Sequence, residues 1–196
     1  MPLHSLFTHP LRGIWKIEES VDKLLKQLPN SESNLPELAT ISSEKRKREW
    51  LAIRLLLREV INENLEIQYL PNGKPLLEES DWNISISHTT GYGAILLSKH
   101  THVGIDIEQI SARPRNIQTR FLSEKELAMS NKEDDLFFPL IAWSAKETAF
   151  KMLGMEGVDF RGHFQILPFS LDKEGTLEII ETRSAQQGIC LINYQI

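Results

Sequence analysis

The order of helix-like and strand-like segments in this sequence predicts an α+β fold. Helix-like segments cover residues 14–28 and the region after Ser42, and strand-like segments follow at 82–87, 92–98 and 103–110. Two further helices and two weaker strands complete the pattern. Because the helices do not alternate regularly with the strands, the order disfavours a doubly wound parallel sheet.

Helix signals dominate the first half of the chain. Apolar residues recur at three- and four-residue intervals over residues 14–28, which predicts a helix, and the Ser- and Asn-rich segment 29–36 is predicted to be a loop. A long helix is predicted to start at Ser42 or Ser43, either of which can cap it. One face of this helix is apolar, with Trp50, Ile53, Leu57, Val60 and Ile61. The other face is basic, with Lys45, Arg46, Lys47, Arg48 and Arg54.

Turn and strand signals occupy the middle of the chain. Residues 71–75 form a turn by composition, with Gly73 available for a positive φ. Strands are predicted at 82–87 and 92–98, joined by His88-Thr89-Thr90-Gly91, and a third strand with clean alternation at 103–110.

Two helices are predicted in the last third. Ser123 and Glu126 have the spacing of a capping box, which predicts a helix over 121–129. A second helix is predicted over 140–153, where Gly154 can end it. The tail contains two weaker strand candidates, 177–181 and 189–194.

Composition excludes several classes of protein. The 196 residues are 41% hydrophobic and 25% charged, an ordinary globular mix that is long enough for one sizeable domain or two small ones. A net charge of −5 disfavours nucleic-acid binding, and a single cysteine, Cys190, excludes an intramolecular disulfide and a cysteine-based zinc cluster. We find no signal-peptide core and no apolar stretch of spanning length, so a cytoplasmic, soluble protein is expected.

The first candidate site is an acidic pair in the predicted strand at 103–110. Val103, Ile105 and Ile107 would face the core, whereas Asp106 and Glu108 would share the opposite face, with their Cα atoms about 7 Å apart. Two carboxylates at this spacing suit a hard cation such as magnesium. A half-buried strand with a solvated acidic face explains the same pattern.

The second candidate site is the segment from Trp143 to Lys151. On a helix, Glu147 and Lys151 lie one turn apart in the favourable order for an ion pair, which alone would be an ordinary surface pair. Trp143 and Phe150 lie on nearly the same stripe as Glu147, which places this carboxylate beside an apolar surface.

The third candidate site combines the basic helix with Lys74 and with the strand ending in Ser87-His88. A concentration of cations in an acidic protein is typical of a polyanion-binding patch, because the Arg fork donates two hydrogen bonds to phosphate. A solvated basic helix face, with His88 in a structural role, is the alternative.

In this order the motifs resemble those of the Sfp-type 4'-phosphopantetheinyl transferases. That family combines a basic helix containing an Ala-x-Arg-like element, a Gly-Lys-Pro turn, a strand ending in Ser-His, a Gly-x-Asp-x-Glu strand and a Trp-Ser-x-Lys-Glu-x-x-x-Lys helix. The matching segments here are 52–54, 73–75, 85–88, 104–108 and 143–151. The segment 121–123 also looks like the one that commonly precedes the second metal motif. The resemblance extends from about residue 45 to residue 154.

The resemblance implies a magnesium-dependent enzyme, with manganese as the alternative metal, that moves 4'-phosphopantetheine from coenzyme A to a serine of an apo carrier protein and releases 3',5'-ADP. The acceptor would be the acyl carrier protein of fatty acid biosynthesis or an acyl or peptidyl carrier domain of a polyketide or peptide synthetase. The implied fold is a pseudo-dimer of two α+β halves, 1–100 and 101–196, with the active site at their interface. The first half would supply the basic helix and coenzyme A contacts, and the second the metal and catalytic carboxylates. A monomer with pseudo-twofold symmetry is expected, without nucleic acid or membrane partners.

The resemblance also implies roles for individual residues. The metal ligands would be Asp106, Glu108 and Glu147. Lys151 would contact the pyrophosphate and the departing 3',5'-ADP, assisted by Lys146, and the expected general base is Glu147. The 3'-phosphate and adenine of coenzyme A would be surrounded by Lys74, Ser87 and His88. Further candidates for the phosphate region are Lys45, Arg48 and Arg54.

Three other functions compete with this one. The chain could bind coenzyme A without transferring any group, or be a phosphate-binding regulatory module built on the basic helix. A magnesium-dependent phosphohydrolase using the same carboxylates would release phosphopantetheine into water and need no carrier.

Overall fold

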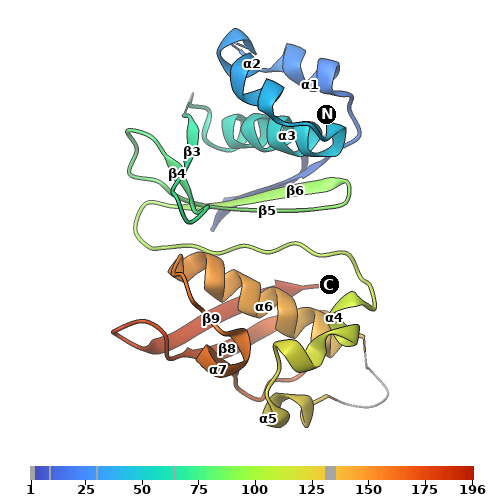
Figure 1. Ribbon diagram of the computed structural model, residues 1–196, viewed down its shortest axis with the longest axis vertical. Coiled ribbons are helices and arrows are strands. Elements are labelled where there is room, and N and C mark those ends of the chain that lie inside the picture. The colour runs from blue at the N-terminus through green and yellow to red at the C-terminus, as the bar shows by residue number, and fades with distance from the viewer. Residues whose placement is uncertain (1–2, 9, 30, 64, 131–135) are drawn as a thin grey trace. The chain divides into compact units, whose positions relative to one another are not determined.

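A computed structural model describes residues 3–8, 10–29, 31–63, 65–130 and 136–196 of the chain. It divides into two compact units, Met1–Ile107 and Glu108–Ile196, each with its own hydrophobic core. The described residues form three small antiparallel sheets with helices packed on them, which confirms the predicted α+β class (Figure 1). The pseudo-dimer arrangement, with its division at residue 100, stays a prediction.

The first unit is built on a four-stranded antiparallel sheet with the strand order β1-β2-β6-β5. The strands are β1 Leu3–Thr8, β2 Leu11–Lys16, β5 Asn83–Thr89 and β6 Tyr92–Ser98. The hairpin of β5 and β6 is the one that the sequence predicts, and its register pairs Ile84 with Leu97 and Ile86 with Ile95. These residues face α3 (Glu44–Ile61), the long basic helix, whose apolar side forms the core with them.

Helix α3 approaches the sheet closely because glycines lie beneath it. A Cβ atom at Gly13 of β2 would be 2.7 Å from Leu56 Cδ1 and 2.8 Å from Val60 Cγ2, and one at Gly93 of β6 would be 2.9 Å from Ile53 Cδ1. The helix begins after Ser43, whose hydroxyl accepts from the Arg46 amide, as a capping serine should. It ends at Asn62, in the left-handed conformation with φ of 52°.

The start of the chain departs from the sequence-based expectation. The predicted helix over 14–28 is a strand, β2, followed by a shorter helix, α1 (Val21–Gln27), capped by Ser20. Pairing of β2 with β6, far along the chain, outweighs the helical periodicity. The predicted loop at 29–36 is mostly helix α2 (Ser31–Thr40), although Asn30 lies outside the described residues. A small hairpin of β3 (Ile67–Tyr69) and β4 (Pro75–Leu77) follows α3, with the predicted turn between its strands.

The second unit packs helix α6 (Phe137–Leu153) against a three-stranded antiparallel sheet. The sheet contains β7 Phe164–Ile166, β8 Glu174–Glu181 and β9 Gly188–Gln195, in that order. The tail strands and the end of α6 at Gly154, with φ of 61°, agree with the sequence-based prediction. Short helical segments complete the unit: α4 Arg113–Asn116, η1 Gln118–Arg120, α5 Glu124–Leu127 and α7 Phe160–His163.

Two predicted elements of this region need correction. The helix expected over 121–129 is reduced to the single turn α5, although its capping box of Ser123 and Glu126 is present. The strand expected at 103–110 does not form, and its Ile105 and Ile107 amides donate to the Ser85 and Ser87 hydroxyls of β5. Within the described ranges, we find no helix long and apolar enough to cross a membrane.

Candidate functional site

A group of cationic side chains gathers where the start of α3 meets the end of β5. Arg46 Nη1 lies 3.2 Å from Glu49 Oε2 and 2.8 Å from His88 Nε2. Lys45 Nζ lies 3.7 Å from Glu49 Oε1 and 3.5 Å from the Thr90 hydroxyl. We call Lys45, Arg46, Glu49 and His88 the α3 cluster. Its cations point outward and are largely exposed, whereas Glu49 beneath them is buried.

Local structure accounts for this group. On α3, positions 45, 46 and 49 share one face because residues three and four apart are neighbours on a helix. On β5, His88 extends from the same face as Ile84 and Ile86, which pack against α3. Three cationic or protonatable groups at an exposed surface can bind a phosphate, so the α3 cluster is a candidate anion site.

The other residues that we expected near the phosphate lie elsewhere in the first unit. Arg54 stacks over the Trp50 ring at 3.2 Å and bonds to Glu37 of α2 and to the Ile67 carbonyl oxygen. Burial lowers the pKa of Arg54, and nearby Glu37 opposes this shift. These contacts join α2, α3 and β3 through Arg54, and its expected phosphate contact stays a prediction.

Two further expected phosphate ligands are half-buried. Arg48, one turn from the α3 cluster, has an Nε atom that is buried without a hydrogen-bond partner among the described residues. Lys74 lies in the turn between β3 and β4, where burial lowers its pKa. Their expected contacts with coenzyme A stay predictions.

Ser87 lies on the opposite face of β5 from His88. Its hydroxyl donates to Asp106 Oδ1 at 3.0 Å and accepts from the Ile107 amide at 3.2 Å, and Ser85 accepts in the same way from the Ile105 amide at 3.1 Å. Two buried hydroxyls therefore hold the segment that carries Asp106 against the sheet. The expected contact of Ser87 with the 3'-phosphate stays a prediction, and the structure adds that this hydroxyl orients Asp106.

In the second unit, the structure brings Glu108 to helix α6. The Trp143 indole Nε1 donates to Glu108 Oε1 at 3.0 Å, and the Trp143 ring packs edge-on against Phe121. Trp143, Glu147 and Lys151 are spaced four residues apart on one continuous helix and so share a stripe. The predicted ligand Glu108 is thus fixed beside the stripe that carries the predicted ligand Glu147.

Lys146 lies in the core of the second unit, with no exposed surface. Its ammonium donates to the carbonyl oxygens of Phe121 and Phe160 at 2.8 and 3.0 Å, and to Glu126, with its closer oxygen 2.7 Å away. Burial lowers the pKa of Lys146, and Glu126 opposes that shift. Three internal acceptors hold this ammonium inside the core, so the expectation that Lys146 assists at the pyrophosphate gains no support from these contacts.

The donor set proposed for a metal can be compared with these positions. Asp106, Glu108 and Glu147 offer only carboxylate oxygens, as magnesium prefers. Two of them are held by hydrogen bonds, from Ser87 and from Trp143. Among the residues that the structure describes, no group of three acidic, histidine or cysteine side chains is gathered as a metal site. Asp106 belongs to the first unit, and Glu108 and Glu147 belong to the second. The suitability of these residues for a metal ion therefore rests on the chemistry of their carboxylate groups.

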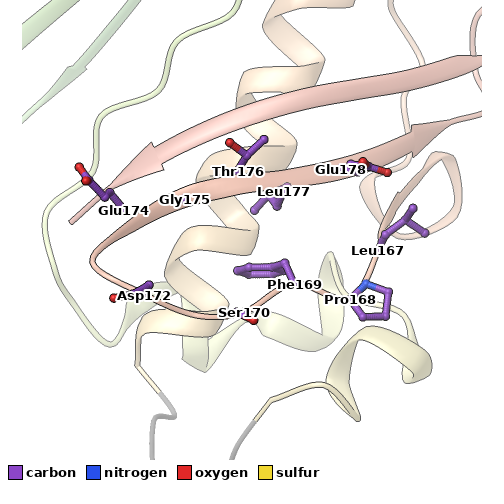
Figure 2. A pocket seen from close by; sticks show the side chains of 10 residues that line it. All are labelled: Leu167, Pro168, Phe169, Ser170, Asp172, Glu174, Gly175, Thr176, Leu177 and Glu178. Atoms are coloured by element: carbon purple, nitrogen blue, oxygen red, sulfur yellow. The ribbon is translucent and has the colours of Figure 1, made fainter.

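A hollow of about 620 Å³ lies elsewhere in the second unit, between the segment 167–172 and β8. Figure 2 shows Phe169 and Leu177 between the loop and the strand, with three carboxylates, Asp172, Glu174 and Glu178, around them. Its lining contains no cation and none of the predicted site residues, and carboxylates would repel a polyanionic ligand.

Sequence reasoning missed two kinds of residue. Arg46 and Glu49 stood in the sequence at a spacing that predicts contact on a helix, but only the fold brings His88 to them. Glu126 appeared as a capping residue, whereas its carboxylate also bonds to Lys146 and to the Ile166 amide. Its capping-box spacing predicts the start of a helix but does not indicate that Glu126 forms a buried ion pair.

Comparison with known proteins adds independent information. Residues 102–193 match the family described as the 4'-phosphopantetheinyl transferase superfamily. The chain is 30% identical over 149 residues to 4'-phosphopantetheinyl transferase gsp of Aneurinibacillus migulanus, covering 72% of this chain and 59% of that protein. It is 29% identical over 140 residues to a Synechocystis sp. protein named "Putative 4'-phosphopantetheinyl transferase slr0495", covering 62% of this chain and 55% of that protein. The match therefore spans less than two thirds of the length of either relative.

Proposed function

Because this chain belongs to the 4'-phosphopantetheinyl transferase superfamily, we propose that it transfers 4'-phosphopantetheine from coenzyme A to a serine of an apo carrier protein. The observation that carries this proposal is the hydrogen bond from Trp143 to Glu108, since it fixes one predicted carboxylate beside the α6 stripe of Glu147 and Lys151. A solvated acidic surface would not require an aromatic donor for one of its carboxylates.

Binding of coenzyme A is assigned to the cations of the first unit. The α3 cluster receives the 3'-phosphate, because Lys45, Arg46 and His88 present donors to solvent over a short distance. Lys74 and Arg48 remain candidates for further contacts with the nucleotide. These assignments explain why a chain with a net charge of −5 concentrates cations at the start of one helix.

Asp106, Glu108 and Glu147 are the residues proposed to hold magnesium, with manganese as the alternative. When bound, the cation neutralises charge on the pyrophosphate and favours departure of 3',5'-ADP. The contribution of the chain is to hold these carboxylates: Ser87 orients Asp106, and Trp143 orients Glu108.

In the proposed reaction, the carrier serine oxygen bonds to the phosphorus next to pantetheine, and the bond from that phosphorus to 3',5'-ADP breaks. Glu147 accepts the serine proton, either directly or through water. Lys151, one turn further on α6, donates to the departing phosphate. No net oxidation or reduction takes place.

The test is intact-mass analysis of apo carrier proteins incubated with this chain, coenzyme A and magnesium. We expect a mass gain of one phosphopantetheine on the carrier. Phosphopantetheine released into water, with no gain on the carrier, would instead identify a phosphohydrolase. Tight binding of coenzyme A without either product would identify a binding module.

A variant series tests the assigned carboxylates. Glu147→Gln is expected to lose transfer by at least about a hundredfold while coenzyme A binding persists, because a general base contributes about 10²–10⁴ in rate. Asp106→Ala is expected to lose activity that added magnesium rescues poorly. Glu178→Gln, an exposed change on β8 in the same chain, is the matched control and should be silent. Near-normal turnover by Glu147→Gln would remove it from catalysis.

The α3 cluster also favours a second candidate function, a phosphate-binding module without transferase activity. Such a module would bind 3',5'-ADP independently of magnesium and would leave every carrier unmodified. The natural carrier, the division of roles between residues 1–100 and 101–196, and a pseudo-twofold monomer remain part of the proposal.

A further inference from the structure

Glu49 is a buried carboxylate beneath an exposed group of cations. Its side chain is 8% exposed, whereas those of Lys45 and Arg46 are 55% and 61% exposed. Both carboxylate oxygens face the cluster: Oε1 faces Lys45, and Oε2 faces both Arg46 and His88. The buried Glu49 carboxylate can therefore restrain the three exposed side chains that contact it.

We propose that Glu49 is a positioning residue that keeps Lys45, Arg46 and His88 converged on the 3'-phosphate and so sets the preference for coenzyme A over its 3'-dephosphorylated form. This inference rests on the proposed function. It assigns Glu49 no contact with the substrate and no part in the chemical step.

A shared counter-charge favours convergence of the two cations. Lys45 and Arg46 are adjacent on α3, and their like charges repel each other when they approach one ligand. Glu49 lies one turn further along and offsets the repulsion, drawing Arg46 to 3.2 Å and Lys45 to 3.7 Å. Long side chains lose substantial rotamer entropy when a ligand orders them, so holding them beforehand favours binding.

The hydrogen bond between Arg46 and His88 extends the same arrangement to β5. A guanidinium can only donate, so His88 Nε2 is the acceptor in this 2.8 Å contact. Glu49 holds Arg46, and Arg46 in turn holds the ring. The group thus joins α3 to the end of β5 at one exposed point, where the three side chains face solvent together.

The alternative is that Glu49 only stabilises the first turns of α3. A stabilising role would affect every nucleotide substrate equally, because it acts through the folded fraction. A positioning role acts only where the 3'-phosphate is present. Comparison of coenzyme A with 3'-dephospho-coenzyme A therefore separates the two explanations.

The experiment measures KM and kcat for both substrates with the wild-type chain, Glu49→Gln and Glu59→Gln. For Glu49→Gln we expect the KM for coenzyme A to rise about tenfold, the effect of weakening one charge-assisted contact, with kcat nearly unchanged. The KM for 3'-dephospho-coenzyme A should stay within about twofold of the wild-type value. Glu59, exposed on the same helix, is the matched control and should change neither constant.

Binding of 3',5'-ADP and of ADP without a 3'-phosphate, measured by calorimetry, gives a second readout that does not depend on catalysis. Glu49→Gln should weaken binding of 3',5'-ADP selectively. Glu49→Asp, which keeps the charge on a shorter side chain, should recover part of the preference and covers the case in which Glu49→Gln folds poorly.

The possible results distinguish failure of the positioning role from failure of the proposed function. Equal changes for the two substrates, no change at all, or tighter binding of 3',5'-ADP by Glu49→Gln would overturn the positioning role. A wild-type chain that modifies no carrier would refute the proposed function instead, and the calorimetric comparison would still decide on Glu49.

Discussion

Glu126 and Glu49 are both buried glutamates with cationic partners, but one is enclosed and the other opens to solvent. Glu126 bonds to Lys146 in the second unit, and neither side chain has any exposed surface. Glu49 bonds to cations in the first unit that are more than half exposed. A buried carboxylate whose cationic partners are enclosed contributes to the stability of the fold. One whose cationic partners are exposed leaves them able to bind an anionic ligand.

The enclosed pair also joins more of the chain. Glu126 accepts hydrogen bonds from the Ser123 and Ile166 amides, and Lys146 donates to the carbonyl oxygens of Phe121 and Phe160. The pair therefore ties α5, α6, β7 and the start of α7 together. The α3 cluster joins α3 to the end of β5 and, through Lys45, to Thr90 in the turn that follows.

The largest expected effect comes from opening the enclosed pair. Lys146→Met should lower the free energy of unfolding by about 3–5 kcal/mol, because it leaves the Glu126 carboxylate buried without its cation. Urea denaturation followed by circular dichroism measures this loss. Lys125→Met, on the exposed side of α5, is the control and should be silent. A loss below about 1 kcal/mol for Lys146→Met would mean that the pair is replaceable by apolar packing.

Substitution of Ser123 shows how far the stabilisation by Glu126 depends on the capping box that the two residues form. Ser123→Ala should cost about 1 kcal/mol, the usual value for a lost N-cap, since Ser123 Oγ accepts from the Glu126 amide. Thermal unfolding of this variant is compared with that of Thr119→Ala, at an exposed position in η1. A loss as large as that of Lys146→Met would show that the cap and the ion pair act as one unit.

The open cluster should contribute little to stability. Glu49→Gln is expected to change the free energy of unfolding by less than about 1 kcal/mol, because its partners are exposed and screened by water. The small difference should shrink further in high salt, which chemical denaturation with and without sodium chloride would detect. A salt-independent loss of several kcal/mol would place Glu49 in the same class as Glu126.

A third buried glutamate is Glu181 at the end of β8, and among the described residues it has no cationic partner. Its behaviour at acid pH extends the comparison. Burial alone would raise its pKa, but hydrogen bonds from the Ser184 hydroxyl and amide and from the Arg183 amide lower it below the ordinary 4.5. Its contribution to stability is therefore complete above pH 4.5 and is lost as the pH falls through the lower folded-state value.

Glu181→Gln should accordingly be less stable than the wild type at neutral pH, and the two should converge on acidification. Urea denaturation at neutral pH and at several values below 4.5 measures this convergence. A difference that stays constant across the whole range would mean that the carboxylate charge at Glu181 is not what the turn requires.

Local patterns in the sequence predicted the elements whose partners are near in the chain. Helix α3 follows from its capping serine and apolar periodicity, and the β5–β6 hairpin from two short alternating runs. Strand β2 was missed because it pairs with β6, about eighty residues away, and no local pattern records that partner. The segment around Asp106 alternates like a strand, but its Ile105 and Ile107 amides donate to the Ser85 and Ser87 hydroxyls and not to a paired strand.

The candidate site was predictable only where residue type and fold agree. Lys45 and His88 are in the exposed group that the sequence suggested, and Trp143 lies beside the acidic residues as its stripe implied. The burial of Lys146 was not predicted because lysines are usually exposed, and no residue near it in sequence indicates Glu126 as its partner. Burial of a charge depends on distant packing, which a single sequence does not record.

The hydrogen bonds from two backbone amides near Asp106 to the Ser85 and Ser87 hydroxyls allow local unfolding of this segment to be measured by hydrogen exchange. The Ile105 and Ile107 amides donate to the Ser85 and Ser87 hydroxyls, so we expect these side-chain contacts to slow their hydrogen exchange. Such contacts can break while the sheet stays intact, so their exchange follows the release of this one segment. Ile107 ends the first unit and Glu108 begins the second, so these two amides monitor the chain where one unit passes into the other.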